Sequence, residues 1–177
     1  MKNNRTYWQG RRTLVTGHEG FLGYWLTKTL VELGAKVIGI DKVKRRNGFI
    51  LNGVRKKILC IKDNVAHQKI VNDIIEKYRP QTIFHLAAEA IVTKANRNPR
   101  KTFRSNIEGT WNVLEAARGK DFIEAIVVAS SDKAYGVHNS LPYTEKMTLR
   151  GDHPYDVSKS CADLLCRSYY TTFQIPV

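Results

Sequence analysis

The chain has 177 residues, 42% hydrophobic and 10% aromatic, so it can bury the core of a globular domain and lacks the composition of a disordered segment. Its net charge of +13 is concentrated in residues 1–60, which hold 13 Lys and Arg against 3 Asp and Glu. Such a basic stretch attracts phosphorylated ligands, nucleic acid or anionic lipid, although a solvated surface has the same composition.

Neither a nucleic acid nor a membrane is expected as the partner. The sequence has no aromatic platform for single strands, no helix-turn-helix pattern and no apolar run approaching about 20 residues. The N-terminus leads into Tyr7, Trp8 and Gln9 instead of the apolar core of a secretion signal. We therefore expect a cytoplasmic protein.

Short apolar runs rich in β-branched residues alternate with amphipathic stretches along the chain. The apolar runs predict strands at 13–16, 36–40, 58–61, 82–86 and 125–129. The amphipathic stretches predict helices at 21–33, 65–78, about 99–118 and about 154–173. In the third of these, an apolar stripe is predicted from Phe103, Ile107, Trp111, Leu114 and Ala117. This alternation predicts an α/β Rossmann fold with a doubly wound parallel sheet. Residues 174–177 read as the approach to a further strand, so we expect the fold to be truncated before its last strands.

A glycine-rich loop, Thr16-Gly-His-Glu-Gly-Phe-Leu-Gly23, joins the first predicted strand to the first predicted helix. In a dinucleotide site, Gly17 permits the tight turn, Gly20 lets the backbone approach a pyrophosphate, and Gly23 allows close packing of helix on strand. We therefore predict a cofactor site in this loop. The cofactor-binding candidates of the loop are Gly17, Glu19, Gly20, Phe21, Leu22 and Gly23.

Asp41 ends the second predicted strand, 18 residues after Gly23. Its carboxylate can accept hydrogen bonds from both hydroxyls of the adenosine ribose and would repel a 2′-phosphate, so NAD is favoured over NADP. The basic residues that follow at once can hold that phosphate and keep NADP as the less favoured alternative. They are Lys42, Lys44, Arg45 and Arg46.

The sequence Tyr155-Asp-Val-Ser-Lys159 places a tyrosine and a lysine one helical turn apart, where an ammonium group can lower the pKa of the phenol. About 25 residues upstream, the predicted strand ends in Ala129-Ser-Ser-Asp-Lys133, which supplies a hydroxyl, an acid and a second amine. A dinucleotide fold, a hydroxyl at a strand end and a helical Tyr/Lys pair together favour hydride transfer at a carbinol.

From Arg12 onward the chain resembles the extended short-chain dehydrogenases/reductases, the NAD-dependent epimerase and dehydratase family of nucleotide sugars, and within it the CDP-glucose 4,6-dehydratase type. The motifs that carry this resemblance are Thr16–Leu26, Phe84–Ala88, Asn106 with Gly109-Thr110, Ser130–Lys133 and Pro154–Lys159 with Cys161-Ala162.

The resemblance implies a lyase that acts on a nucleotide sugar. It makes Tyr155 the base at the sugar O4, Lys159 its tuning residue and a ligand of the nicotinamide ribose, and Ser131 a hydrogen-bonding partner near O4. Asp132 is then the acid at C6, and Lys133 occupies the position of the C5 base, where most 4,6-dehydratases have glutamate. Lys133 must lose its proton for this role, which needs desolvation or neighbouring positive charge.

The resemblance also implies further cofactor-binding residues. These are Asp63 and Asn64 at the adenine end, Leu86, Ala87 and Ala88 along the cofactor, and Asn106 near the site, beside Lys42, Tyr155 and Lys159. It implies a homodimer formed through the two helices at about 99–118 and 154–173. Relatives run to roughly twice this length, so we expect residues 1–177 to be one NAD(P)-binding domain without the substrate-binding portion.

Three alternatives remain open. A nucleotide-sugar 4-epimerase needs Tyr155 and Lys159 but not Asp132 and Lys133, a non-catalytic dinucleotide-binding module fits the short length, and charge alone favours an RNA- or membrane-binding protein. No metal is expected, because the histidines have no ligand spacing and are read as structural or loop residues.

Overall fold

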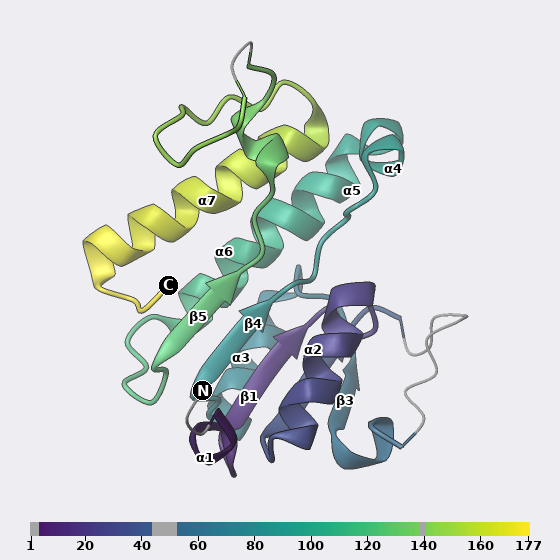
Figure 1. Ribbon diagram of the computed structural model, residues 1–177, viewed down its shortest axis with the longest axis vertical. Coiled ribbons are helices and arrows are strands. Elements are labelled where there is room, and N and C mark those ends of the chain that lie inside the picture. The colour runs from purple at the N-terminus through teal and green to yellow at the C-terminus, as the bar shows by residue number, and fades with distance from the viewer. Residues whose placement is uncertain (1–3, 44–52, 139–140) are drawn as a thin grey trace.

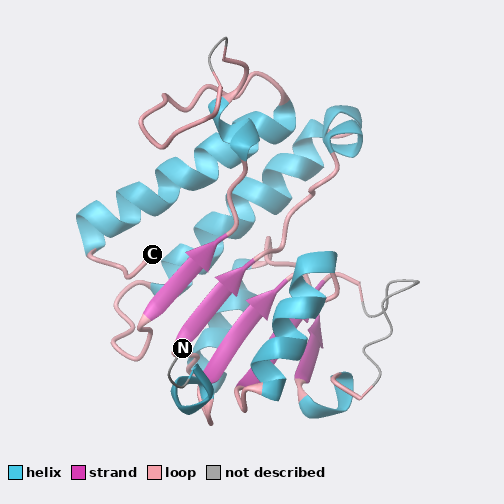
Figure 2. Ribbon diagram, in the orientation of Figure 1, coloured by secondary structure: helices cyan, strands magenta, loops and turns pink. Residues whose placement is uncertain are grey.

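The computed structural model describes residues 4–43, 53–138 and 141–177. Its centre is a five-stranded parallel sheet of order β3-β2-β1-β4-β5, whose arrows all point the same way (Figure 2). The chain crosses from β3 to the far side of β1 to form β4, the switch typical of a Rossmann sheet. The strands are β1 (Arg12–Thr16), β2 (Lys36–Asp41), β3 (Leu59–Lys62), β4 (Thr82–His85) and β5 (Ala125–Val128).

Helices cover both faces of this sheet, with α2 in front of the strands and α3 and α6 behind them (Figure 1). The predicted doubly wound α/β fold is therefore confirmed, and the five strands were predicted to within one residue at each end. The helices are α1 (Asn4–Trp8), α2 (Phe21–Glu32), α3 (Gln68–Tyr78), α4 (Val92–Arg97), α5 (Pro99–Phe103), α6 (Gly109–Ala117) and α7 (Pro154–Phe173), with 3₁₀ turns η1 (Arg55–Lys57) and η3 (Asp132–Tyr135).

Consecutive residues of β1 serve two separate cores. Leu14 packs with the isoleucines of α3 behind the sheet, and Val15 packs with Leu30 of α2 in front of it. Alternate side chains of a strand point to opposite faces, so a strand buried on both sides must be apolar throughout. This explains why the predicted strands read as continuous apolar runs.

The stretch predicted as one helix at about 99–118 contains a π-helical segment, η2 (Arg104–Glu108), between α5 and α6. Its predicted apolar stripe also divides: Leu114 is fully buried, whereas Trp111 is 52% exposed. Sequence periodicity did not predict α1, α4 or the π-helical segment, because each is short and depends on its neighbours in space.

After α7 the chain returns alongside β5, beside which the C-terminus lies in Figure 1. The Ile126 amide of β5 donates to the Pro176 carbonyl at 2.7 Å, and Ile175 is buried in the core behind the sheet. This agrees with the expectation that residues 174–177 approach a further strand position. Of the helices in the described ranges, none is both long and apolar enough to cross a membrane.

Candidate functional site

The predicted site residues come together along one edge of the sheet, where the five parallel strands end. The glycine loop follows β1, Asp41 ends β2, and Asp63 follows β3. Leu86 follows β4, and the Ser131–Lys133 segment follows β5. Ligands of open parallel sheets bind at this carboxyl edge, close to the switch in strand order.

The glycine loop requires glycine at two positions, at Gly17 because of its backbone angle and at Gly23 because a side chain has no room. Gly17 has a φ of +74°, and a Cβ there would stand 2.8 Å from the Ala87 backbone nitrogen. A Cβ at Gly23 would overlap the Gly17 carbonyl oxygen and stand 2.8 Å from His18 Cα. The first turn of α2 therefore lies directly against the loop, which exposes the helix N-terminus as a dinucleotide diphosphate requires.

The Asp41 carboxylate is buried and held in place by backbone amides. Its Oδ2 accepts from the Glu19 amide at 3.1 Å, and its Oδ1 accepts from the Val43 amide at 3.0 Å. Each oxygen keeps a lone pair for a further donor, so the carboxylate can bind two adjacent hydroxyls. The geometry fits the predicted ribose contact.

Next to Asp41, the Asp63 amide donates to the Asp41 carbonyl at 3.1 Å. The Asn64 amide and the His67 imidazole bond Asp63 Oδ1 and hold the pKa of this carboxyl below its ordinary value. Lys42 is exposed, with Nζ 3.9 Å from Glu89 Oε2. The other residues considered for a 2′-phosphate, Lys44, Arg45 and Arg46, lie outside the described residues.

A buried chain of hydrogen bonds next to the glycine loop connects the ends of β1 and β4 with α6. The amides of Leu86 and Ala87 both donate to Thr16 Oγ1 at 3.1 Å, which leaves the Thr16 hydroxyl proton for His85 Nδ1 at 2.8 Å. His85 must then carry its proton on Nε2 and donate it to Thr110 Oγ1 at 3.1 Å. Burial lowers the pKa of His85 to about 3, so the imidazole is neutral.

Asn106 continues this chain toward α7. Its backbone carbonyl accepts from the Thr110 hydroxyl at 2.6 Å, and its side-chain amide bonds both backbone groups of Glu89. The same side chain donates to Ser158 Oγ at 2.9 Å, and Ser158 donates to the Tyr155 carbonyl at 2.6 Å. The π-helical segment therefore contains the residue that links the β4 loop to the helix of Tyr155, and such segments are frequent at functional sites.

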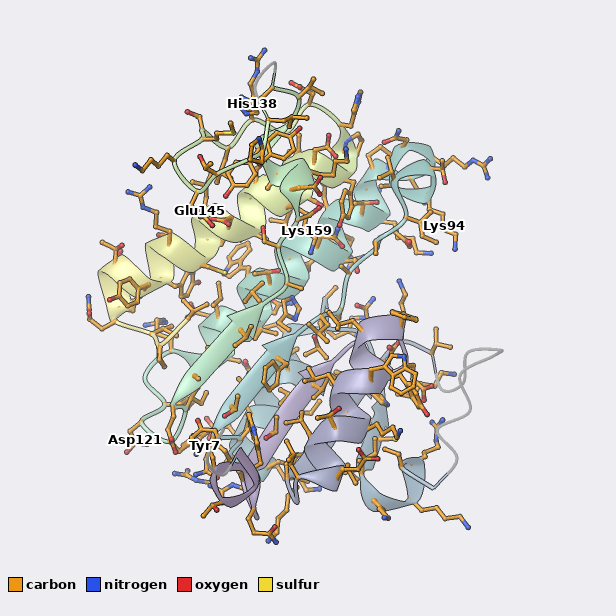
Figure 3. All side chains as sticks on the ribbon, in the orientation of Figure 1. Tyr7, Lys94, Asp121, His138, Glu145 and Lys159 are labelled. Atoms are coloured by element: carbon orange, nitrogen blue, oxygen red, sulfur yellow. The ribbon has the colours of Figure 1, made fainter. Side chains whose placement is uncertain are left out.

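Tyr155 and Lys159 lie one turn apart in the first part of α7, and both are buried. Lys159 Nζ donates to the Ala129 carbonyl at 2.5 Å, at the end of β5, and Figure 3 shows this side chain near the centre of the molecule. Burial lowers the pKa of Lys159. The lysine therefore connects α7 with the segment that precedes Ser131.

The segment after β5 forms a turn instead of extending the strand. Ser131 caps η3: its Oγ accepts from the Lys133 amide at 3.2 Å and donates to Asp132 Oδ1 at 3.0 Å. Ser160 of α7 donates to the Ala134 carbonyl at 2.7 Å, which holds this turn against the helix of Tyr155. Asp132 and Lys133 are both exposed, so the described residues do not supply the desolvation that a lysine base needs.

Sequence reasoning missed one feature of the glycine loop. Glu19 was predicted to bind cofactor, yet its side chain is buried and its Oε1 lies 2.7 Å from an Arg55 guanidinium nitrogen. The His18 imidazole packs on Gly39, and burial lowers its pKa. The Glu19 amide, in contrast, donates to the Asp41 carboxylate at the candidate ribose site.

The remaining histidines occupy scattered positions. His138 is partly buried and His153 is exposed, each in a loop near η3 or α7. Among the described residues, no group of three or more His, Cys, Asp or Glu side chains is placed to hold a metal ion. The cysteines Cys60, Cys161 and Cys166 are free and partly buried.

Comparison with known proteins connects this arrangement to one family. The family model described as GDP-mannose 4,6 dehydratase matches residues 14–177. The chain is 34% identical to CDP-glucose 4,6-dehydratase of Salmonella typhimurium, covering 98% of this chain and 49% of that protein. It is 30% identical to a probable UDP-glucuronate 4-epimerase of Rhizobium meliloti, covering 93% of this chain and 50% of that protein.

A solved structure shares the fold and part of the sequence. The dTDP-glucose 4,6-dehydratase of Streptomyces venezuelae, solved with NAD, superposes with a TM-score of 0.84 at 26% identity, covering 93% of this chain and 52% of that one. The chain thus spans about half the length of the relatives it matches.

Proposed function

The chain belongs to the GDP-mannose 4,6-dehydratase family, and on this premise we propose that it is the NAD-binding part of a nucleotide-sugar 4,6-dehydratase with a CDP-glucose-like substrate. The observation that carries the proposal is the join between the end of β5 and α7. Lys159 bonds the Ala129 carbonyl and Ser160 bonds the Ala134 carbonyl, so the Ser131–Lys133 turn is held against the helix of Tyr155. An acid and a second amine thereby adjoin the Tyr/Lys pair.

The geometry of the strand ends supports the cofactor contacts that we propose. The glycine loop at the N-terminus of α2 would hold the diphosphate, and the Asp41 carboxylate would hold the adenosine ribose hydroxyls. A negative Asp41 beside the ribose supports NAD over NADP. When bound, NAD supplies the hydride acceptor for sugar carbon 4 and the hydride donor for carbon 6.

The chain's own groups would perform the proton transfers. Tyr155 takes the proton from the O4 hydroxyl, aided by the charge of Lys159, and Ser131 bonds the same oxygen. The ketone formed at C4 acidifies the C5 proton, which Lys133 removes, while Asp132 protonates the departing C6 hydroxyl. Because Lys133 is exposed in this chain, we propose that bound substrate and the second half of the enzyme desolvate it.

A nucleotide-sugar 4-epimerase is the second candidate. The match to a probable UDP-glucuronate 4-epimerase favours it, since such an enzyme uses the Tyr155 and Lys159 pair without the elimination pair. The two functions differ in what Asp132 and Lys133 do. In a non-catalytic dinucleotide-binding module, neither the Tyr155–Lys159 pair nor Asp132 and Lys133 would take part in a reaction.

The first test uses the chain as it is. Calorimetry should show NAD binding that is clearly tighter than NADP binding, and Asp41→Ala should narrow the preference because the charge that opposes a 2′-phosphate is gone. Absence of NAD binding would overturn the proposal.

The reaction is tested in a fusion of this chain to the second half of the Salmonella enzyme, incubated with NAD and CDP-glucose. Lys133→Ala should still oxidise carbon 4, seen as nicotinamide reduction, but form no 4-keto-6-deoxy product. Tyr155→Phe should fail at both steps, because oxidation needs the O4 proton removed first. Unimpaired dehydration by Lys133→Ala removes lysine from the mechanism, and inversion at carbon 4 without dehydration makes the enzyme an epimerase.

A further inference from the structure

A basic hollow of about 280 Å³ opens beside the proposed adenine end of the site. Three parts of the chain line it: Lys42 after β2, Asn64 before α3, and Arg100, Lys101 and Arg104 of α5 and the π-helical segment. Every lining side chain is polar and none is a carboxylate. We call this hollow the anion pocket.

The charges of the anion pocket are only partly compensated. Arg104 Nε donates to Glu108 Oε2 at 3.1 Å, and Lys42 has its acidic partner at 3.9 Å. Neither Arg100 nor Lys101 has a carboxylate within 4 Å among the residues that the structure describes. Two uncompensated cations therefore border a concave space beside two paired ones, which raises the local positive potential.

This pocket is separate from the loop expected to hold the cofactor diphosphate. The glycine loop opens α2, which covers the front of the sheet, whereas α3 and α6 lie behind it and α5 lies beyond the ends of the strands (Figure 1). The anion pocket is at the start of α3 and α5, past the end of β2. A ligand group there would lie beyond the adenosine end of a bound dinucleotide.

We propose that the anion pocket binds a phosphate group distinct from the cofactor diphosphate. Guanidinium groups bind phosphate oxygens through paired N–H donors, and ammonium groups add point charge, so two arginines and two lysines without a lining carboxylate match this chemistry. The phosphate is either the 2′-phosphate of NADP, the less favoured cofactor, or part of a separate phosphorylated compound. Only the first source rests on the proposed cofactor.

The test compares two double variants that remove the same charge. Arg100→Gln with Lys101→Gln alters the anion pocket, and Lys94→Gln with Arg97→Gln alters exposed residues of the neighbouring α4, outside the pocket. Lys94 is labelled at the α4 end of the molecule in Figure 3. Pyrophosphate is titrated into each protein by calorimetry, without NAD and with saturating NAD, which occupies the glycine loop.

Pyrophosphate binding should weaken by about tenfold or more in the pocket variant and stay within about twofold in the α4 variant. A parallel comparison of NADP with NAD identifies the source. If the pocket holds a 2′-phosphate, the affinity of NADP relative to NAD falls about tenfold in the pocket variant. If it holds a separate compound, that ratio is unchanged while pyrophosphate binding falls.

Absence of pyrophosphate binding to the unaltered chain, or equal binding by both double variants with an unchanged NADP-to-NAD ratio, would overturn the proposal. A chain that binds pyrophosphate through the pocket but does not bind NAD would refute the proposed function and leave the anion pocket standing. The two proposals can therefore fail independently.

Discussion

His85 shows how a single side chain ties the candidate site together. Its ring nitrogens bond Thr16 at the end of β1 and Thr110 at the start of α6, so one neutral imidazole connects the glycine loop to the helix behind the sheet. A protonated ring would carry a proton on Nδ1, where the Thr16 hydroxyl now donates, and would break that bond. The low pKa of His85 is thus the consequence of burial and is reinforced by the direction of its hydrogen bonds.

We predict that the stability of the chain falls as the pH is lowered below about 6.5, the ordinary pKa of histidine. The folded pKa of His85 is about 3, so between these values the unfolded chain binds a proton that the folded chain does not. The free energy of unfolding should then fall by up to about 1.4 kcal/mol per pH unit from this residue alone. Above about pH 6.5 the contribution of His85 to the free energy of unfolding does not change with pH.

Heteronuclear NMR of the histidine rings checks this prediction. The His85 ring should keep the signals of the neutral tautomer protonated on Nε2 until the protein unfolds, with the exposed His153 as the reference ring. Uptake of a proton by His85 in the folded protein near pH 6 would contradict the buried chain of hydrogen bonds.

At the scale of the element, the position of α2 against the glycine loop depends on a single residue, Gly23. Its first turn touches the loop that precedes it, because a Cβ at Gly23 would meet the Gly17 carbonyl oxygen and His18 Cα. These are backbone atoms, which cannot turn aside as a side chain can. The same contact keeps the helix N-terminus at the end of β1.

Gly23→Ala should therefore displace α2 from the loop. We expect a loss of about 1–3 kcal/mol in the free energy of unfolding, as for overpacking in a filled core, together with a large loss of NAD affinity. Thr29→Ala, at an exposed position of the same helix, serves as the control and should change neither. Denaturant unfolding and calorimetry measure the two effects, and a Gly23→Ala protein of unchanged stability and affinity would refute this account.

At the scale of the whole molecule, α6 and α7 carry exposed apolar side chains. Trp111 of α6 is 52% exposed, and Leu164 and Phe173 of α7 are 53% and 47% exposed. Tyr169 of α7 bonds Glu115 of α6 at 2.8 Å, so the two helices hold this surface together. We propose that it forms the interface of a homodimer, which the family resemblance also implies.

Light scattering across a wide concentration range should find a dimer. Trp111→Arg and Leu164→Arg should each shift the protein toward monomer, because burying a guanidinium in an apolar interface is costly. Val127→Arg alters the exposed edge strand β5 and tests association through the sheet edge instead. A monomer at every concentration, or a dimer sensitive only to Val127→Arg, would contradict the proposed interface.

The sequence by itself determined the alternation of strands and helices, the glycine loop and the Tyr155–Lys159 pair. Apolar periodicity and the spacing of special residues are local properties, so they can be recognised from the sequence without knowing which elements pack together. The family comparison and the parallel sheet confirm the fold that these patterns predict. The roles of the candidate site residues stay predictions.

Only the tertiary structure decided which groups meet. It paired Glu19 with Arg55, turned Asn106 toward Ser158 through a π-helical segment, and separated Leu114 from Trp111 on one predicted stripe. It also brought Lys42 and Arg100, far apart in the chain, to the wall of one pocket. Such contacts depend on the order of the strands and on which face each helix covers, and no local pattern of residues encodes those long-range choices.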